Sequence, residues 1–150
     1  MAVMAELLLR GWNVALPEVD VGEDLFVIED ETGRLTRIQV KTATARTQRD
    51  GYSAQFSVSL RQLSKPRVPD LIYIFAFRSE ARWETFLIIE RSALREEQEL
   101  HHVGNISGDN VVLRFVSSGA SLTCSGRDFR PYRGDWSRWP VLSIALWSSS

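Results

Sequence analysis

Cysteine, histidine and long apolar runs are all scarce in this chain of 150 residues. The single cysteine, Cys124, excludes an intrachain disulfide framework and is typical of a reducing compartment. The two histidines, His101 and His102, are adjacent, so on a helix they do not face each other and favour a surface role over a metal pair. No apolar run reaches the ~18 to 20 residues that span a bilayer, and Glu6 interrupts the apolar N-terminus, unlike a signal peptide. We therefore predict a cytoplasmic protein with no membrane partner.

A strong net charge is also missing, because 18 basic residues nearly balance 19 acidic ones. The net charge of −1 provides no general attraction to nucleic acid, although it leaves room for a local basic patch. The length suits one domain with a sizeable core, and the sequence has no repeat, low-complexity tract or linker. We predict a single domain over 1–150, with 127–150 as a C-terminal extension packed on it.

Hydrophobic periodicity and composition predict an α/β or α+β chain built around one mixed sheet. Helices are expected over 1–10, 60–65 and 91–102, the last with Ser92 as its N-cap and Glu97 on its solvated face. Strands are expected over 12–16, 25–28, 35–41, 52–59, 71–77, 83–90 and 111–116. The polar stretch 42–51 is expected to be a loop or a mobile arm, and 117–125 a loop or a frayed edge.

The stretch Asp24–Lys41 is a predicted β-hairpin that carries the candidate site. Gly33 can supply the positive φ of its turn. Alternation along the second strand puts Gln39 and Lys41 on one face, and Asp24, at the start of the first strand, can meet them across the hairpin. An acidic oxygen, an amide oxygen and an ammonium on one sheet face are the parts of a divalent-metal site for phosphodiester hydrolysis.

Mg²⁺ is the expected cofactor of such a site, with Mn²⁺ as an alternative, because Mg²⁺ takes oxygen ligands and keeps several waters. Asp24 would be the anionic ligand, Gln39 would offer its amide oxygen and Val40 its main-chain carbonyl. Lys41 would stabilise the transition state as a point charge. The alternative is that Asp24 only begins a strand and that Gln39 and Lys41 lie on a wet sheet face. No small-molecule organic cofactor is expected.

Three stretches of the sequence resemble the PD-(D/E)XK nuclease superfamily. They are Leu7-Leu8-Leu9-Arg10-Gly11-Trp12-Asn13-Val14, then Val21-Gly22-Glu23-Asp24-Leu25 after Pro17, and Arg37-Ile38-Gln39-Val40-Lys41-Thr42-Ala43. The resemblance is to the branch typified by group I intron homing endonucleases, where the acidic-x-Lys motif is written Gln-x-Lys. The later stretches 69–75 and 85–89 also fit that branch, so the resemblance covers roughly residues 1 to 95. It implies a restriction-endonuclease-like core, with a central mixed β-sheet flanked by helices.

By this resemblance, Asp24 is a metal ligand, Gln39 replaces the second acidic ligand and Lys41 is the catalytic lysine of a Mg²⁺-dependent DNA endonuclease. The family often has a further glutamate on its first helix, and Glu6 is the acidic residue on the helix here. Glu6 is either a shifted replacement for that glutamate or a surface residue. The loop 20–23 offers two more carboxylates, at its two ends. Because Gln39 carries no charge, an inactive nuclease-fold module that binds nucleic acid or protein is the alternative function.

Clustered arginines predict contacts to DNA, the expected partner. Arg46 and Arg49 follow the candidate site directly along the chain. Over 127–139, arginines that include Arg130 and Arg133 are interleaved with aromatic residues. That pattern fits phosphate and base contacts, and equally fits rings packed on the core with solvated arginines. A homo-oligomer through the Trp-rich C-terminus is also expected, as recognition of two-fold DNA would need.

Overall fold

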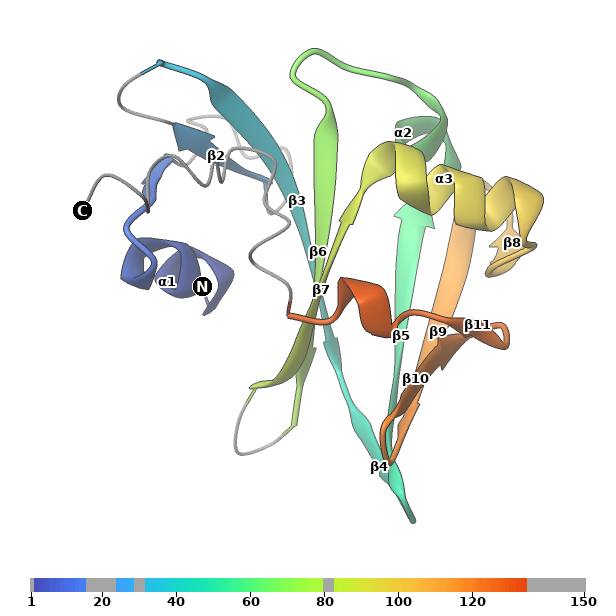
Figure 1. Ribbon diagram of the computed structural model, residues 1–150. Helices are drawn as coiled ribbons and strands as arrows, with labels where there is room; N and C mark the ends of the chain where they lie inside the picture. Colours follow the sequence, from blue (N-terminus) through green and yellow to red (C-terminus); the bar gives the residue numbers. More distant parts are fainter. Residues whose placement is uncertain (1, 16–23, 29–31, 80–82, 135–150) are drawn as a thin grey trace.

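The computed structural model describes residues 2–15, 24–28, 32–79 and 83–134, with the main chain alone at Asp24, Trp83 and Glu84. Within these residues the chain is α/β, with two β-sheets, three α-helices and one 3₁₀ turn (Figure 1). The predicted α/β class is therefore confirmed. The second sheet is the main departure from the prediction, which had a single sheet.

The first sheet has five strands of mixed direction, in the order β1-β2-β3-β6-β7. β2 and β3 form the predicted antiparallel hairpin, and β3 also pairs with β6 in parallel. β6 lies inside the sheet and is buried along nearly its whole length, as its continuous apolar sequence predicts. The five strands are β1 (Asn13–Ala15), β2 (Asp24–Ile28), β3 (Leu35–Thr44), β6 (Leu71–Arg78) and β7 (Trp83–Glu90).

The second sheet is antiparallel, in the order β11-β10-β9-β5-β4, with β8 also pairing with β9. The stretch 42–51, predicted as a loop or mobile arm, contains β4, and 117–125, predicted as a loop or frayed edge, contains β10. Those two predictions were wrong because strands of 3 and 4 residues are too short to show a period, while main-chain hydrogen bonds to β5 and β9 hold them in place. The strands are β4 (Arg46–Gln48), β5 (Gly51–Ser59), β8 (Asn105–Ser107), β9 (Asn110–Ser118), β10 (Ser121–Cys124) and β11 (Arg127–Asp128).

Helices cover only part of the first sheet. α1 (Ala2–Leu9) packs on one face, whereas the second sheet packs on the other (Figure 1). α2 (Leu60–Ser64) and α3 (Arg91–Leu100) close one end of the space between the two sheets. The predicted flanking by helices therefore holds on the α1 face, and the opposite face is covered mainly by strands β5 and β9.

Each face of the first sheet has its own apolar core. The α1 face buries Val3 and Leu7 of the helix against strand residues that include Ile38 and Val40 of β3. The face toward the second sheet buries an aromatic cluster, with Phe56, Phe75, Phe77, Phe115 and Phe129 among its members. Since neighbouring residues of a strand point to opposite faces, β3 presents its even-numbered apolar residues to α1 and its odd-numbered residues to the other side.

α3 begins and packs differently from the prediction. Glu90, with an extended backbone, is the N-cap in place of Ser92. Glu97 is buried and not solvated, because Arg127 Nε donates to its carboxylate at 2.9 Å and the Tyr132 hydroxyl donates at 3.5 Å. The partners of Glu97 come from the chain after β10, so a local pattern on the helix could not reveal them.

The chain after β10 packs on the domain as far as it is described. The 3₁₀ turn η1 (Arg130–Tyr132) follows β11, and Phe129 is buried in the core between the sheets. Residues 135–150, with Trp136, Trp139 and the apolar stretch 141–147, lie outside the described residues. The homo-oligomer expected through that segment stays a prediction. Among the described helices, none is long and apolar enough to cross a membrane.

Candidate functional site

The hairpin of β2 and β3 places Asp24 directly opposite Gln39. Asp24 is the first residue of β2, where the main chain alone is described. Directly opposite residues are the nearest cross-strand neighbours in an antiparallel pair. The register therefore brings these two predicted positions together, as the hairpin prediction required. The carboxylates at the ends of the loop 20–23 lie outside the described residues.

A chain of side-chain hydrogen bonds holds Gln39, which is only 5% exposed. Gln62 Nε2 donates to Gln39 Oε1 at 3.1 Å, and the Tyr73 hydroxyl donates to Gln62 Oε1 at 3.0 Å. The protein thus uses one lone pair of the Gln39 oxygen, and an amide oxygen has a second lone pair to offer to a ligand.

Gln62 is a member of this site that sequence reasoning missed. It lies on α2, which begins after Ser59, and the Ser59 hydroxyl accepts a hydrogen bond from Gln62 N at 3.2 Å. The signal was present as Ser59-Leu60-Arg61-Gln62, the spacing of a capping box. The Gln62 side chain reaches Gln39 on β3 instead of returning to Ser59, and this long-range contact was not visible in the sequence.

Lys41 lies between Gln39 and Ala43 on the same face of β3, since residues two apart in a strand share a face. On this face Gln39 contacts α2 and Ala43 packs against the core between the sheets. Lys41 is half-buried and pairs in register with Phe75 of β6. No described residue forms an ion pair with its ammonium. The charge of Lys41 is therefore available to an anionic ligand.

The main-chain carbonyl of Val40 points toward the β2 side of β3. Ala45 N donates to Arg78 O of β6 at 2.7 Å, so Ala45 turns its main-chain polar groups toward β6. Successive residues of a strand turn these groups to alternate sides, and Val40 lies an odd number of residues before Ala45. The described pairing of β2 ends where Asp24 meets Gln39, next to Val40. The carbonyl oxygen of Val40, the predicted third metal ligand, therefore lies on the same side of β3 as Asp24.

Arg37, to which sequence reasoning gave no role in the site, lies two residues before Gln39 on the same face of β3. Its guanidinium carbon is 5.6 Å from the ring centroid of Phe26, its partner in register on β2. Arg37 Nε is buried and has no hydrogen-bond partner among the described residues. Arg37 and Lys41 therefore flank Gln39 with positive charge.

Glu6 lies across the sheet from Gln39. α1 packs on the face that Ile38 and Val40 form, whereas Gln39 contacts α2 on the opposite face. Glu6 forms an i,i+4 ion pair with Arg10 at 3.5 Å, and both side chains are partly exposed. The structure does not bring Glu6 together with Gln39 and Lys41, because it places them on opposite sides of β3. Its position favours the surface interpretation.

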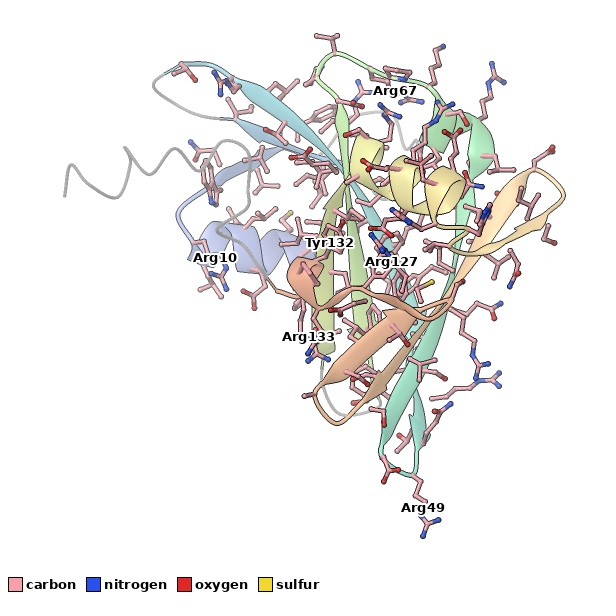
Figure 2. The ribbon with its side chains drawn as sticks, turned by 45° about the vertical axis from the view of Figure 1, so that its right-hand side comes forward. Arg10, Arg49, Arg67, Arg127, Tyr132 and Arg133 are labelled. Carbon is pink, nitrogen blue, oxygen red and sulfur yellow. The ribbon has the colours of Figure 1, made fainter. Side chains whose placement is uncertain are left out.

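The β4–β5 hairpin carries two of the arginines predicted to contact nucleic acid. Arg46 is exposed on β4, two residues after Thr44, where β3 ends. Arg49 is exposed at the tip of the hairpin, where it points away from the body of the molecule (Figure 2). Neither forms an ion pair within the described part of the chain.

The other two predicted arginines are engaged by the protein itself. Arg130 Nη2 lies 3.0 Å from Asp128 Oδ2, and Arg130 lowers the pKa of the Asp128 carboxyl by hydrogen bonding to it. Arg133 Nη2 donates to Ser117 Oγ at 3.1 Å. With Phe129 buried in the core, the packing interpretation of this segment describes residues 127–134 better than the nucleic-acid interpretation does.

The candidate metal ligands next to Asp24 are oxygen atoms, the type of ligand that Mg²⁺ binds. Gln39 and Val40 offer oxygens, but neither oxygen carries a full charge. Among the described residues there is no cluster of three His, Cys, Asp or Glu side chains. Within the part of the chain that the structure describes, a cation here would depend on Asp24 for a charged ligand. The donor set therefore fits Mg²⁺ or Mn²⁺ in type, with fewer charges than a carboxylate pair provides.

A buried arginine holds α2, and with it Gln62, in position. Arg91 is 5% exposed, and its Nη1 donates to Leu63 O of α2 at 2.8 Å. Its Nε and Nη2 donate to the two carboxylate oxygens of Asp70 at 2.8 and 3.0 Å. The hydrogen bonds from Arg91 lower the pKa of Asp70 below its ordinary value of 3.8. Asp70 and Arg91 thus join the start of β6, the start of α3 and the end of α2.

Cys124 is a structural thiol. It lies in the core between the sheets, 1% exposed. Burial raises the pKa of its thiol to about 11, so the reactive thiolate is scarce at neutral pH. Cys124 therefore takes no part in the candidate site.

No family model, curated protein or solved structure matches this chain significantly.

Proposed function

We propose that this chain is a Mg²⁺-dependent DNA endonuclease with a restriction-endonuclease-like core, acting through Asp24, Gln39, Val40 and Lys41. The observation that carries the proposal is the register that sets Asp24 opposite Gln39, with Lys41 next on the same face of β3. The chain order supports it, because helix, strand, Asp, hairpin and Gln-x-Lys follow one another as in the nuclease family that the sequence resembles.

Each residue has a separate task in this proposal. Asp24 supplies the negative charge that holds a divalent cation, and Gln39 and Val40 supply neutral oxygens. Bound Mg²⁺ would polarise the phosphate and lower the pKa of an attacking water. The ammonium of Lys41 stabilises the charge that develops on the phosphate in the transition state. Gln62 keeps the amide of Gln39 oriented.

Plasmid cleavage tests the endonuclease directly. Purified protein with Mg²⁺ or Mn²⁺ should nick or linearise plasmid DNA, and Asp24→Ala and Lys41→Ala should each lower the rate by roughly 10²-fold or more. Glu96→Gln, on the exposed face of α3, is the matched control and should leave the rate unchanged. Wild-type protein that cuts neither duplex, branched nor single-stranded DNA with any divalent metal would rule the endonuclease out.

An inactive binding module is the second candidate, favoured by the neutral Gln39 and its existing hydrogen bond from Gln62. Titration calorimetry separates the two functions. Millimolar or tighter Mg²⁺ binding that disappears in Asp24→Asn argues for the enzyme. DNA binding without any metal binding argues for the module.

A further inference from the structure

A polar groove lies where the two sheets meet, next to the candidate site. It has a volume of about 410 Å³ and is lined from β3, β4, β5 and β9 by Ala43, Thr44, Arg46, Ser53, Gln55 and Arg114. Ala43 is two residues from Lys41 on the same face of β3, which is about 7 Å along the strand. The groove therefore begins beside the lysine that the proposed function makes catalytic.

Strand pairing brings two arginines to this groove from different strands. Arg46 is directly opposite Ser53, and Arg114 is directly opposite Gln55. Ser53 and Gln55 are two apart on β5, on the face away from the buried Phe56, so all four residues share one face. β4 and β9 flank β5, and the two pairs are two residues apart along β5, which puts the Cα atoms of the two arginines roughly 12 Å apart, within reach of one small anion.

The charge of the groove is positive and uncompensated. Its lining contains Arg46 and Arg114 and no carboxylate. Neither arginine forms an ion pair with a described residue. Both are exposed. The charges of Arg91 and Arg127, in contrast, are paired with carboxylates of the fold. Guanidinium groups with hydroxyl and amide neighbours match the oxygens of a phosphodiester, which accept hydrogen bonds only.

We propose that this groove is a phosphate-binding subsite, in which Arg46 and Arg114 hold a phosphodiester of the nucleic-acid strand beside the bond that faces Lys41. The proposal rests on the proposed function for the cleavage reaction that the subsite serves. Phosphate binding in the groove does not itself require cleavage. A groove of this volume holds one unit of a strand rather than a whole duplex. Contact is with the backbone, so the groove sets affinity and register and reads no base sequence.

Binding without cleavage tests the subsite. Fluorescence anisotropy with a labelled 30-nucleotide DNA, single-stranded and duplex, is measured in EDTA between 50 and 200 mM salt. Arg46→Gln and Arg114→Gln should each weaken binding about tenfold, equally for unrelated base sequences. Each should also reduce, by about 1, the slope of the logarithm of the binding constant against the logarithm of the salt concentration. Circular dichroism and thermal melting check that the variants are folded.

Arg34→Gln is the matched control, because it removes the same charge from the β2–β3 turn. That turn is roughly 30 Å along β3 from Thr44. Arg34→Gln should bind DNA like the wild type. If Arg46→Gln and Arg114→Gln bind DNA with the same affinity and the same salt dependence as Arg34→Gln, the subsite is overturned. So would equally tight binding of polyglutamate with the same losses, because it would make the ligand an acidic peptide.

Different experimental results would refute the proposed subsite and the proposed endonuclease. Lys41→Ala should lose cleavage, and in that variant Arg46→Gln and Arg114→Gln should still weaken DNA binding in EDTA. Wild-type protein that binds DNA through Arg46 and Arg114 but cuts no DNA would refute the enzyme and support the subsite. Protein that cuts DNA with no dependence on the two arginines would refute the subsite alone.

Discussion

Gln39 shows how one side chain limits the chemistry of this site. In the proposed nuclease, its amide replaces the second acidic ligand of the resembling family, so the proposed site has one negative charge fewer. The hydrogen bond from Gln62 orients the amide oxygen of Gln39 but also occupies one of its two lone pairs. Arg37 and Lys41 add positive charge on both sides of Gln39. Such a site suits an anionic substrate better than it suits a cation alone, and a metal ion would gain affinity once a phosphate is present.

Asp70 and Arg91 provide a stability prediction with a defined pH dependence. Asp70→Asn should lower the free energy of unfolding by about 2 kcal/mol near pH 7, because it removes a charged acceptor from a buried guanidinium. This is below the effect of a fully buried pair, since the Asp70 side chain is 42% exposed. Urea denaturation of both proteins at several pH values measures the difference.

The sign of the pH effect follows from the lowered pKa of Asp70. A carboxyl whose folded pKa lies below its ordinary value of 3.8 stabilises the fold fully above that value. The stabilisation is lost as the pH falls through the folded pKa. The difference between wild type and Asp70→Asn should therefore be constant from pH 6 to 8 and shrink below about pH 4. A difference that grows on acidification would contradict the assignment. Asp109→Asn, at an exposed position, is the control.

The β4–β5 hairpin is an element that its polar sequence concealed. It connects the first sheet to the second and carries Arg46 near the end of β3 and Arg49 at its tip. Its position depends on Gly51, where β5 approaches β9 so closely that an added Cβ would lie 1.8 Å from Ser117 O. The opposing atom belongs to the main chain, so a rotamer change cannot relieve the clash.

Gly51→Ala should therefore destabilise the protein by about 3 kcal/mol, the upper end of the usual cost of overpacking. The clash should separate the ends of β5 and β9, and amide hydrogen exchange should become faster there than in β6. Ser57→Ala, at an exposed position of β5, should leave both stability and exchange unchanged. Wild-type stability in Gly51→Ala would show that the two strands do not approach as described.

The two sheets are joined by aromatic packing. Phe115 of β9 lies at the centre of the cluster, with ring centroids 5.3 to 5.8 Å from four other phenylalanines. Two of these rings come from β6 in the first sheet, and the others from β5 and the segment after β11. The packing of the sheets, and so the groove between β3 and β5, depends on this cluster.

Phe115→Ala should cost about 3–5 kcal/mol of unfolding free energy, because it removes a fully buried ring and leaves a cavity. Thermal and urea denaturation measure the loss. Leu100→Ala, at a side chain that is 66% exposed, should change stability by less than about 0.5 kcal/mol. Similar effects of the two substitutions would contradict a core centred on Phe115.

The sequence by itself determined the local elements: α1, the β2–β3 hairpin, the buried strand β6 and the face that Gln39 and Lys41 share. These follow from helix propensity, turn residues and a period of two, which act between residues close in the chain. Only the tertiary structure decided the second sheet, the contact of Gln62 with Gln39, the burial of Glu97 and the position of Glu6 across the sheet from Gln39. Such features depend on how distant segments share apolar surface and hydrogen bonds, and no short pattern contains both partners. The groove that Arg46 and Arg114 line is of this second kind, because β5 and β9 must pair before the two arginines meet.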